Sequence, residues 1–173
     1  PEACGSPLVI ADLEDAIQYA IKNGNVDSNN VHIIGVSGGG YAAMLAYMKL
    51  NYPVKSFNAW VGISDLSNWY WEQKGRNAKY ATDIEQVAMK DGVMNWQELD
   101  SRSPIKLSFP AEKRKNSTLN IYAGVHDGYT GSVPISHSIL FYNKIAAALY
   151  PGKKEILVSE GILISLLAKR TNP

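Results

Sequence analysis

The stretch Gly35-Val36-Ser37-Gly38-Gly39 places a serine among glycines, directly after one apolar run and before another. This is a Gly-x-Ser-x-Gly pattern, in which a sharp turn between a strand and a helix presents a nucleophilic serine. Small residues suit such a turn, because a side chain at Gly35 or Gly39 would clash with the adjoining strand and helix. The N–H of Gly38, together with the start of the helix, would then face a developing oxyanion.

Two other interpretations of the glycine turn stay open. A phosphate-binding loop also joins a strand to a helix, but Tyr41 follows the glycines where a Walker loop needs Lys and then Ser or Thr. A dinucleotide site needs an acidic residue about 20 positions later, and residues 56–59 offer none. The third interpretation is plain backbone geometry, with Ser37 only capping the helix.

A serine nucleophile needs a base, and the base needs an acid that orients it. On this type of turn the chain order is Ser, then acid, then His. Asp127 follows the third apolar run, and a carboxylate at the C-terminal end of a parallel strand lies where ligands bind. The alternative for Asp127 is an ordinary turn aspartate before Gly128. Asp65, just after the second apolar run, is a weaker candidate for the acid.

Alternating strands and helices must position these residues. Apolar runs predict strands at 31–36, 57–63 and 118–125. Helices are predicted at 11–23, 41–50, 133–150 and Glu160 to Arg170, with another near Asp83 to Lys90. This alternation indicates an α/β fold, a parallel sheet flanked by helices on both faces. We expect one domain over residues 1–173, with an aromatic-rich insertion at about 64–108.

The insertion begins with three aromatic residues, Trp69, Tyr70 and Trp71. In an extended segment, side chains alternate, so Trp69 and Trp71 would both be free to face a substrate. The alternative is that these rings cover the core, as large aromatic side chains usually do. Trp69 and Trp71 are therefore weak candidates for substrate binding.

The bulk composition narrows the choice of partners. Seventeen basic and sixteen acidic residues give a net charge of +1, which provides no electrostatic reason to expect nucleic acid or an anionic membrane. No segment approaches the roughly 20 apolar residues that a membrane span needs. Cys4 is the single cysteine, and no Cys/His spacing suggests zinc, so neither a metal nor a cofactor is predicted.

Three segments resemble the catalytic domain of prolyl-oligopeptidase-type α/β-hydrolases: GVSGGGYAAM, RSPI and IYAGVHDGYTGSVPISHSILFYNKI. The resemblance covers roughly residues 8–150 and implies a serine hydrolase that cleaves an ester or peptide bond through an acyl-enzyme intermediate. It assigns Ser37 as nucleophile and Asp127 as acid, and leaves peptidase and esterase open. The family usually has fewer residues between the acid and Val-Pro than the five here, which predicts a differently shaped loop around Asp127.

The family's histidine lies in a loop after the last strand, and no histidine here fits that place. His137 falls in a predicted helix, His126 would point away from the side of Asp127 if the strand continues, and His32 lies at the far end of its strand. We expect a fragment that lacks the first strands and the C-terminal histidine loop and is inactive alone. Its exposed sheet edges would favour a homo-oligomer. The alternative is a non-catalytic binding or scaffold module that has lost its base.

Overall fold

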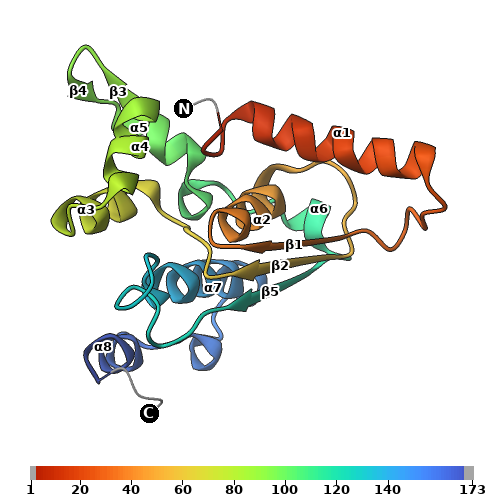
Figure 1. Ribbon diagram of the computed structural model, residues 1–173. Coiled ribbons are helices and arrows are strands. Elements are labelled where there is room, and N and C mark those ends of the chain that lie inside the picture. The colour runs from red at the N-terminus through yellow and green to blue at the C-terminus, as the bar shows by residue number, and fades with distance from the viewer. Residues whose placement is uncertain (1–2, 170–173) are drawn as a thin grey trace.

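The chain forms a three-stranded parallel sheet flanked by helices, which confirms the predicted fold class (Figure 1). The structure is a computed structural model and describes residues 3–169. The central strand β2 (Ser56–Trp60) pairs with β1 (His32–Val36) on one side and β5 (Thr118–Tyr122) on the other. Because all three strands are parallel, their C-terminal ends lie along the same edge of the sheet.

Helix α2 (Gly38–Lys49) is the centre of the hydrophobic core. Every residue from Gly40 to Met48 except Ala42 is buried, because α2 packs against β1 and β2 on one side and other helices around it. The ring of Tyr47 meets the ring of Phe57 of β2 edge-on, with their centroids 5.2 Å apart. Helix α1 (Pro7–Asn23) packs outside α2 and begins earlier than predicted, because proline suits the first turn of a helix.

A buried arginine closes the C-terminal end of α2. Arg114, in the short helix α6 (Ala111–Arg114), is 3% exposed and donates hydrogen bonds to the carbonyls of Ala46, Tyr47 and Leu50. Its guanidinium also lies over the Tyr47 ring, 5.7 Å from the centroid. The last carbonyls of a helix lack intrahelical partners and carry partial negative charge, so a buried cation there is well matched.

The aromatic-rich insertion is mostly helical, and the prediction of an extended segment at residues 69–71 is wrong. The insertion contains α3 (Leu66–Gly75), α4 (Lys79–Ala88), a hairpin of β3 (Met89–Lys90) and β4 (Val93–Met94), and α5 (Trp96–Arg102). Asp65 is the N-cap of α3, and its side chain accepts a hydrogen bond from Asn68 N at 3.0 Å. The predicted helix near residues 83–90 overlaps α4.

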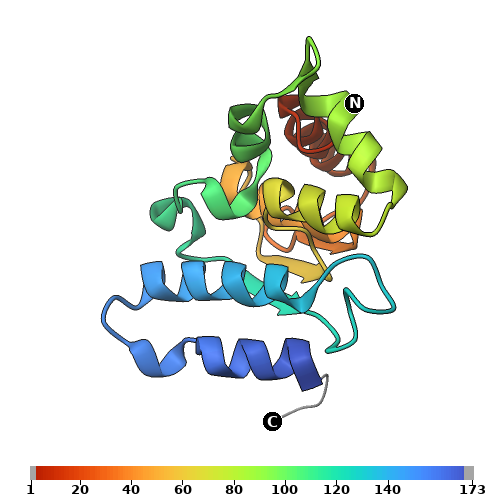
Figure 2. The ribbon, with the colours of Figure 1, turned by 90° about the vertical axis from the view of Figure 1, so that its left-hand side faces the viewer.

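The remaining elements are one short turn before β5 and three elements after it. The 3-10 turn η1 (Pro104–Lys106) ends the insertion, and β5 is followed by helix α7 (Ile135–Leu149), a second 3-10 turn η2 (Lys154–Ile156) and helix α8 (Glu160–Lys169). Helices α7 and α8 lie side by side (Figure 2). The predicted end of the last helix, Arg170, lies outside the described residues. Within residues 3–169, no helix combines the length and apolar character needed to cross a membrane.

Two strands end earlier than predicted, and both ends bear on the site. Strand β2 stops at Trp60 because the next residue, Val61, has φ +45°, outside the range of extended backbone. Strand β5 stops at Tyr122, where the chain turns into the loop that carries Asp127. The predicted strands ran three residues too far in both cases.

One face of the sheet carries exposed apolar side chains. Val36, Trp60 and Tyr122 are in register across the three strands, so their side chains share a face, and they are 63%, 46% and 40% exposed. The rings of Trp60 and Tyr122 stack, with centroids 4.2 Å apart. Within the described residues, β1 and β5 are the edge strands of this sheet. Association through these edges stays a prediction.

Candidate active site

Ser37 occupies a strained turn between β1 and α2. Its backbone has φ +54° and ψ −115°, which a residue with a side chain rarely adopts. The Ser37 N–H donates to the carbonyl of Trp60 at 2.9 Å, and the Ser37 carbonyl accepts from Tyr41 N at 2.9 Å. Such a conformation persists only where the surroundings enforce it, and it leaves Ser37 exposed at the C-terminal edge of the sheet.

The glycines around the turn divide into two groups. A Cβ added to Gly35 would lie 2.0 Å from the Gly39 carbonyl oxygen, and one added to Gly40 would lie 2.4 Å from the Trp60 carbonyl oxygen. The turn therefore has no room for a side chain at position 35, as predicted. The prediction for Gly39 is wrong, because a Cβ there meets nothing within 4 Å. Gly40 is the glycine at which α2 crosses closely over β2.

Gly38 is the first residue of α2. The first N–H groups of a helix have no intrahelical acceptor and form its positive end. A Cβ added to Gly38 would meet no atom within 4 Å, so the backbone beside Ser37 is open on that side. This arrangement can donate a hydrogen bond to an anion formed next to the Ser37 hydroxyl.

Asp127 lies in the turn after β5 and is half-buried. Its Oδ2 accepts a hydrogen bond from Gly124 N at 2.6 Å, and its own N–H donates to the Gly124 carbonyl at 3.1 Å. Gly128 has φ +83°, and a Cβ there would lie 2.4 Å from Pro134, so the turn demands glycine after the aspartate. Asp127 also lines an open pocket of about 470 Å³ together with Trp60 and other residues at the ends of β2 and β5.

Asp65, the second candidate acid, is 5% exposed and serves as the N-cap of α3. Besides the hydrogen bond from Asn68, its Oδ2 lies 3.7 Å from Nζ of Lys106. Its carboxylate therefore already has structural partners on both oxygens.

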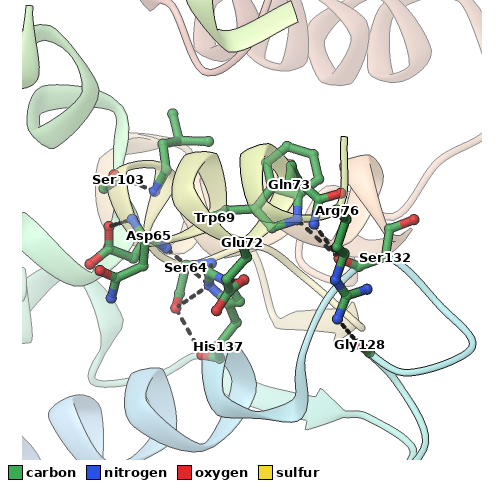
Figure 3. Close-up of polar contacts among 12 residues, drawn as sticks. Ser64, Asp65, Trp69, Glu72, Gln73, Arg76, Ser103, Gly128, Ser132 and His137 are labelled. Atoms are coloured by element: carbon green, nitrogen blue, oxygen red, sulfur yellow. Dashed lines mark hydrogen bonds and ion pairs between the residues drawn. The ribbon is translucent and has the colours of Figure 1, made fainter. Parts of the chain in front are cut away.

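The three histidines have different surroundings. His137 lies in α7, as predicted, and is 3% exposed. Its Nδ1 accepts from the backbone N–H groups of Ser64 and Asp65 at 3.2 and 3.3 Å, so we assign the proton to Nε2, which lies 3.1 Å from Glu72 Oε2. Figure 3 shows this cluster between the start of α3 and α7.

The other two histidines are at the surface. His32 begins β1, at the edge of the sheet opposite Ser37, and its Nδ1 lies 2.7 Å from Ser56 Oγ. His126 is exposed in the turn next to Asp127. The direction expected for the His126 side chain was conditional on the strand continuing to it, and β5 ends at Tyr122, so that condition is not met.

The two tryptophans that sequence reasoning offered for substrate binding lie in different environments. Trp69 is 9% exposed, and its indole N–H donates to the Ser132 carbonyl at 3.1 Å, so this residue is not free to face a ligand. Trp71 is 59% exposed and stacks on Trp96 with ring centroids 5.7 Å apart. Both lie on a helix, where residues two apart do not share a face.

Among residues 3–169, no group of three or more His, Cys, Asp or Glu side chains is arranged to hold a metal ion. Sequence reasoning missed Trp60, whose carbonyl fixes Ser37. No local signal marks this residue, because its role depends on strand pairing across the sheet.

The parallel sheet and the strained serine turn between strand and helix define a protein of the α/β-hydrolase class. The chain belongs to the prolyl oligopeptidase family, whose family model matches residues 9–159. This family consists of peptidase-type hydrolases, in agreement with the resemblance found from the sequence. Comparison with curated proteins gives no match.

Solved structures with the same fold include two kinds of peptidase. A puromycin-hydrolysing peptidase of Mycobacterium tuberculosis has a TM-score of 0.60 and 20% identity over 80% of this chain. An acylaminoacyl peptidase in complex with Z-Gly-Gly-Phe-chloromethyl ketone has a TM-score of 0.61 and 18% identity over 83% of this chain. The acylaminoacyl peptidase of Pyrococcus horikoshii has a TM-score of 0.55 and 19% identity over 79%. The chain spans 19%, 21% and 20% of these proteins, respectively.

Proposed function

We propose that the protein is a serine hydrolase that cleaves an ester or peptide bond by acyl transfer, with Ser37 as the nucleophile. The observation that carries this proposal is the backbone of Ser37, held at φ +54° with its N–H bonded to Trp60. A serine that only caps a helix needs no such strain. Family membership supports peptides or small esters as the substrate class.

In this proposal, Asp127 orients the base and the Gly38 N–H stabilises the oxyanion. Ser37 and Asp127 follow β1 and β5, which flank β2 at spacings of about 4.8 Å each, so roughly 10 Å separates the two outer strands. Within residues 3–169, the Asp127 carboxylate accepts its hydrogen bond from Gly124 N and makes none with the Ser37 hydroxyl. The proposal therefore needs a third group between the two side chains, and an imidazole is the usual one.

We further propose that these 173 residues alone do not hydrolyse substrate. His137 uses both ring nitrogens in contacts with Ser64, Asp65 and Glu72, and His32 lies at the opposite edge of the sheet. His126 is exposed beside Asp127, but the Asp127 carboxylate accepts its hydrogen bond from Gly124 N and does not orient the His126 ring. The absence of a histidine positioned beside Ser37 within residues 3–169 also favours a second candidate, a binding or scaffold module that has the fold without the base. Ser37 without a positioned base is a weak nucleophile near neutral pH.

The test is labelling of the complete protein, expressed from its whole coding sequence, with a fluorophosphonate probe. We expect modification of Ser37 that disappears in Ser37→Ala and slows in Asp127→Asn. Absence of labelling, or labelling that survives Ser37→Ala, would exclude the hydrolase and favour the binding module. If Asp65→Asn stops labelling while Asp127→Asn does not, the acid is Asp65.

The 173-residue chain provides a second test. We expect no Ser37-dependent hydrolysis of a p-nitrophenyl ester above background, because removal of a triad base usually lowers the rate by orders of magnitude. Turnover that vanishes in both Ser37→Ala and His137→Ala would make His137 the base.

A further inference from the structure

Helix α3 holds the loop between β5 and α7 through side chains on one face (Figure 3). Trp69 and Gln73 both donate hydrogen bonds to the Ser132 carbonyl, at 3.1 and 2.8 Å. Arg76, just after α3, donates to the carbonyls of Gly128 and, at 3.1 Å, Gly131. We call Trp69, Gln73 and Arg76 the α3 clamp.

The spacing of the clamp residues explains how one helix reaches the whole loop. Positions 69, 73 and 76 are related as i, i+4 and i+7, so their side chains line one face of α3 and its cap. All the acceptors are backbone carbonyls in residues 128–132, directly after Asp127. Gln73 is 1% exposed, so its bond to the loop is shielded from water.

The N-terminal end of α3 is also held by hydrogen bonds to the rest of the structure. Ser103 Oγ accepts from Leu66 N at 2.9 Å, and the Ser64 hydroxyl donates to the His137 carbonyl at 2.8 Å. His137 in turn reaches Glu72 in the middle of the helix, at 3.1 Å. Helix α3 is therefore a fixed support, and a loop bonded to it has its backbone fixed relative to the core.

We propose that Trp69, Gln73 and Arg76 are positioning residues that fix the Asp127 carboxylate for catalysis. This inference rests on the proposed function, in which Asp127 orients the base. Within residues 3–169, the Asp127 side chain accepts its one hydrogen bond inside its own turn, from Gly124 N. The turn itself is joined to the core through the carbonyls that the clamp holds, so loosening the clamp displaces the carboxylate without changing its chemistry.

The first measurement is hydrogen–deuterium exchange of the complete protein, followed by mass spectrometry of the peptide 124–133. We expect Arg76→Met to speed exchange in this peptide about tenfold or more, because it removes two charge-assisted hydrogen bonds. Trp69→Phe keeps a smaller aromatic ring and removes the indole N–H donor, so a smaller increase is expected. Lys74→Met is the matched control on the same helix, because Lys74 bonds to Glu85 and should leave this peptide unchanged.

The second measurement asks whether the clamp acts through Asp127. The rate of fluorophosphonate labelling of Ser37 should fall about tenfold in Arg76→Met, and Arg76→Lys should recover part of it. In the Asp127→Asn background, Arg76→Met should have no further effect, because the group that it positions is already gone.

Three results would overturn the inference. One is unchanged exchange of peptide 124–133 in both Arg76→Met and Trp69→Phe. The second is an additive loss of labelling when Arg76→Met is combined with Asp127→Asn. The third is faster exchange everywhere in the protein, which would indicate a role in stability alone. Failure of the proposed function is distinguishable, because it appears as absent labelling in the unmodified protein, whereas the exchange measurement needs no chemistry at Ser37.

Discussion

Replacing either of two glycines in the turn, Gly35 and Gly39, by alanine should change the free energy of unfolding in opposite directions. A methyl group at Gly35 would lie 2.0 Å from the Gly39 carbonyl oxygen and 2.9 Å from Gly40 N. Inserting a group into a packed site typically costs 1–3 kcal/mol. Here the obstructing atoms are backbone and cannot rotate away, so we expect Gly35→Ala to lower the free energy of unfolding by about 3 kcal/mol or more.

Gly39→Ala is the matched substitution. Its methyl group would meet nothing within 4 Å, and Gly39 lies in the first turn of α2. Alanine favours a helix over glycine by roughly 0.5–1 kcal/mol, so a gain of up to about that size is expected. Urea unfolding followed by tryptophan fluorescence measures both changes, provided that the slope with urea stays constant. Equal effects of the two substitutions, or a tolerated Gly35→Ala, would refute the description of the turn.

Two further predictions concern charged side chains. Arg114→Met should lower the free energy of unfolding by about 3 kcal/mol, because it leaves buried carbonyls at the end of α2 without a donor. The control is Lys115→Met at the exposed neighbouring position, which should change the free energy of unfolding by less than about 0.5 kcal/mol. A loss below about 1 kcal/mol in Arg114→Met would contradict the capping role. Hydrogen bonds from Lys74 and Tyr70 hold the pKa of Glu85 below its ordinary value of 4.5. The contribution of the ionised Glu85 to stability is therefore complete above pH 4.5 and is lost as the pH falls through the lowered pKa. We expect Glu85→Gln to flatten this part of the acid-unfolding curve. An unaltered curve would contradict this prediction.

The sequence was informative where the determinants are local. Gly35, Ser37 and Asp127 lie in short motifs whose strand and helix neighbours are adjacent in the chain, and the structure places them at the ends of β1 and β5. The alternation of apolar strands and helices likewise predicted the parallel sheet, because burial on the sheet requires it.

The errors concern contacts between distant segments. Whether Gly39 or Gly40 is the tight position depends on how α2 crosses β2, which the motif does not encode. Trp69 belongs to a helix that is fixed by Asp65 at its start and by the loop after β5, 63 residues away. Nothing local reveals those partners. The spacing of Trp69, Gln73 and Arg76 was the available signal, but it needed a helix at that place to be recognised.

The turn at Ser37 also makes this position a defined attachment point for reagents added from outside. Its geometry depends on the Trp60 carbonyl and on the neighbouring glycines rather than on the hydroxyl, so Ser37→Cys is expected to keep the turn and present a thiol to solvent. The natural cysteine, Cys4, competes poorly, because burial raises the pKa of its thiol and only the thiolate reacts readily. A fluorophore, spin label or crosslinker can therefore be fixed at one known place, the turn between β1 and α2 at the C-terminal edge of the sheet.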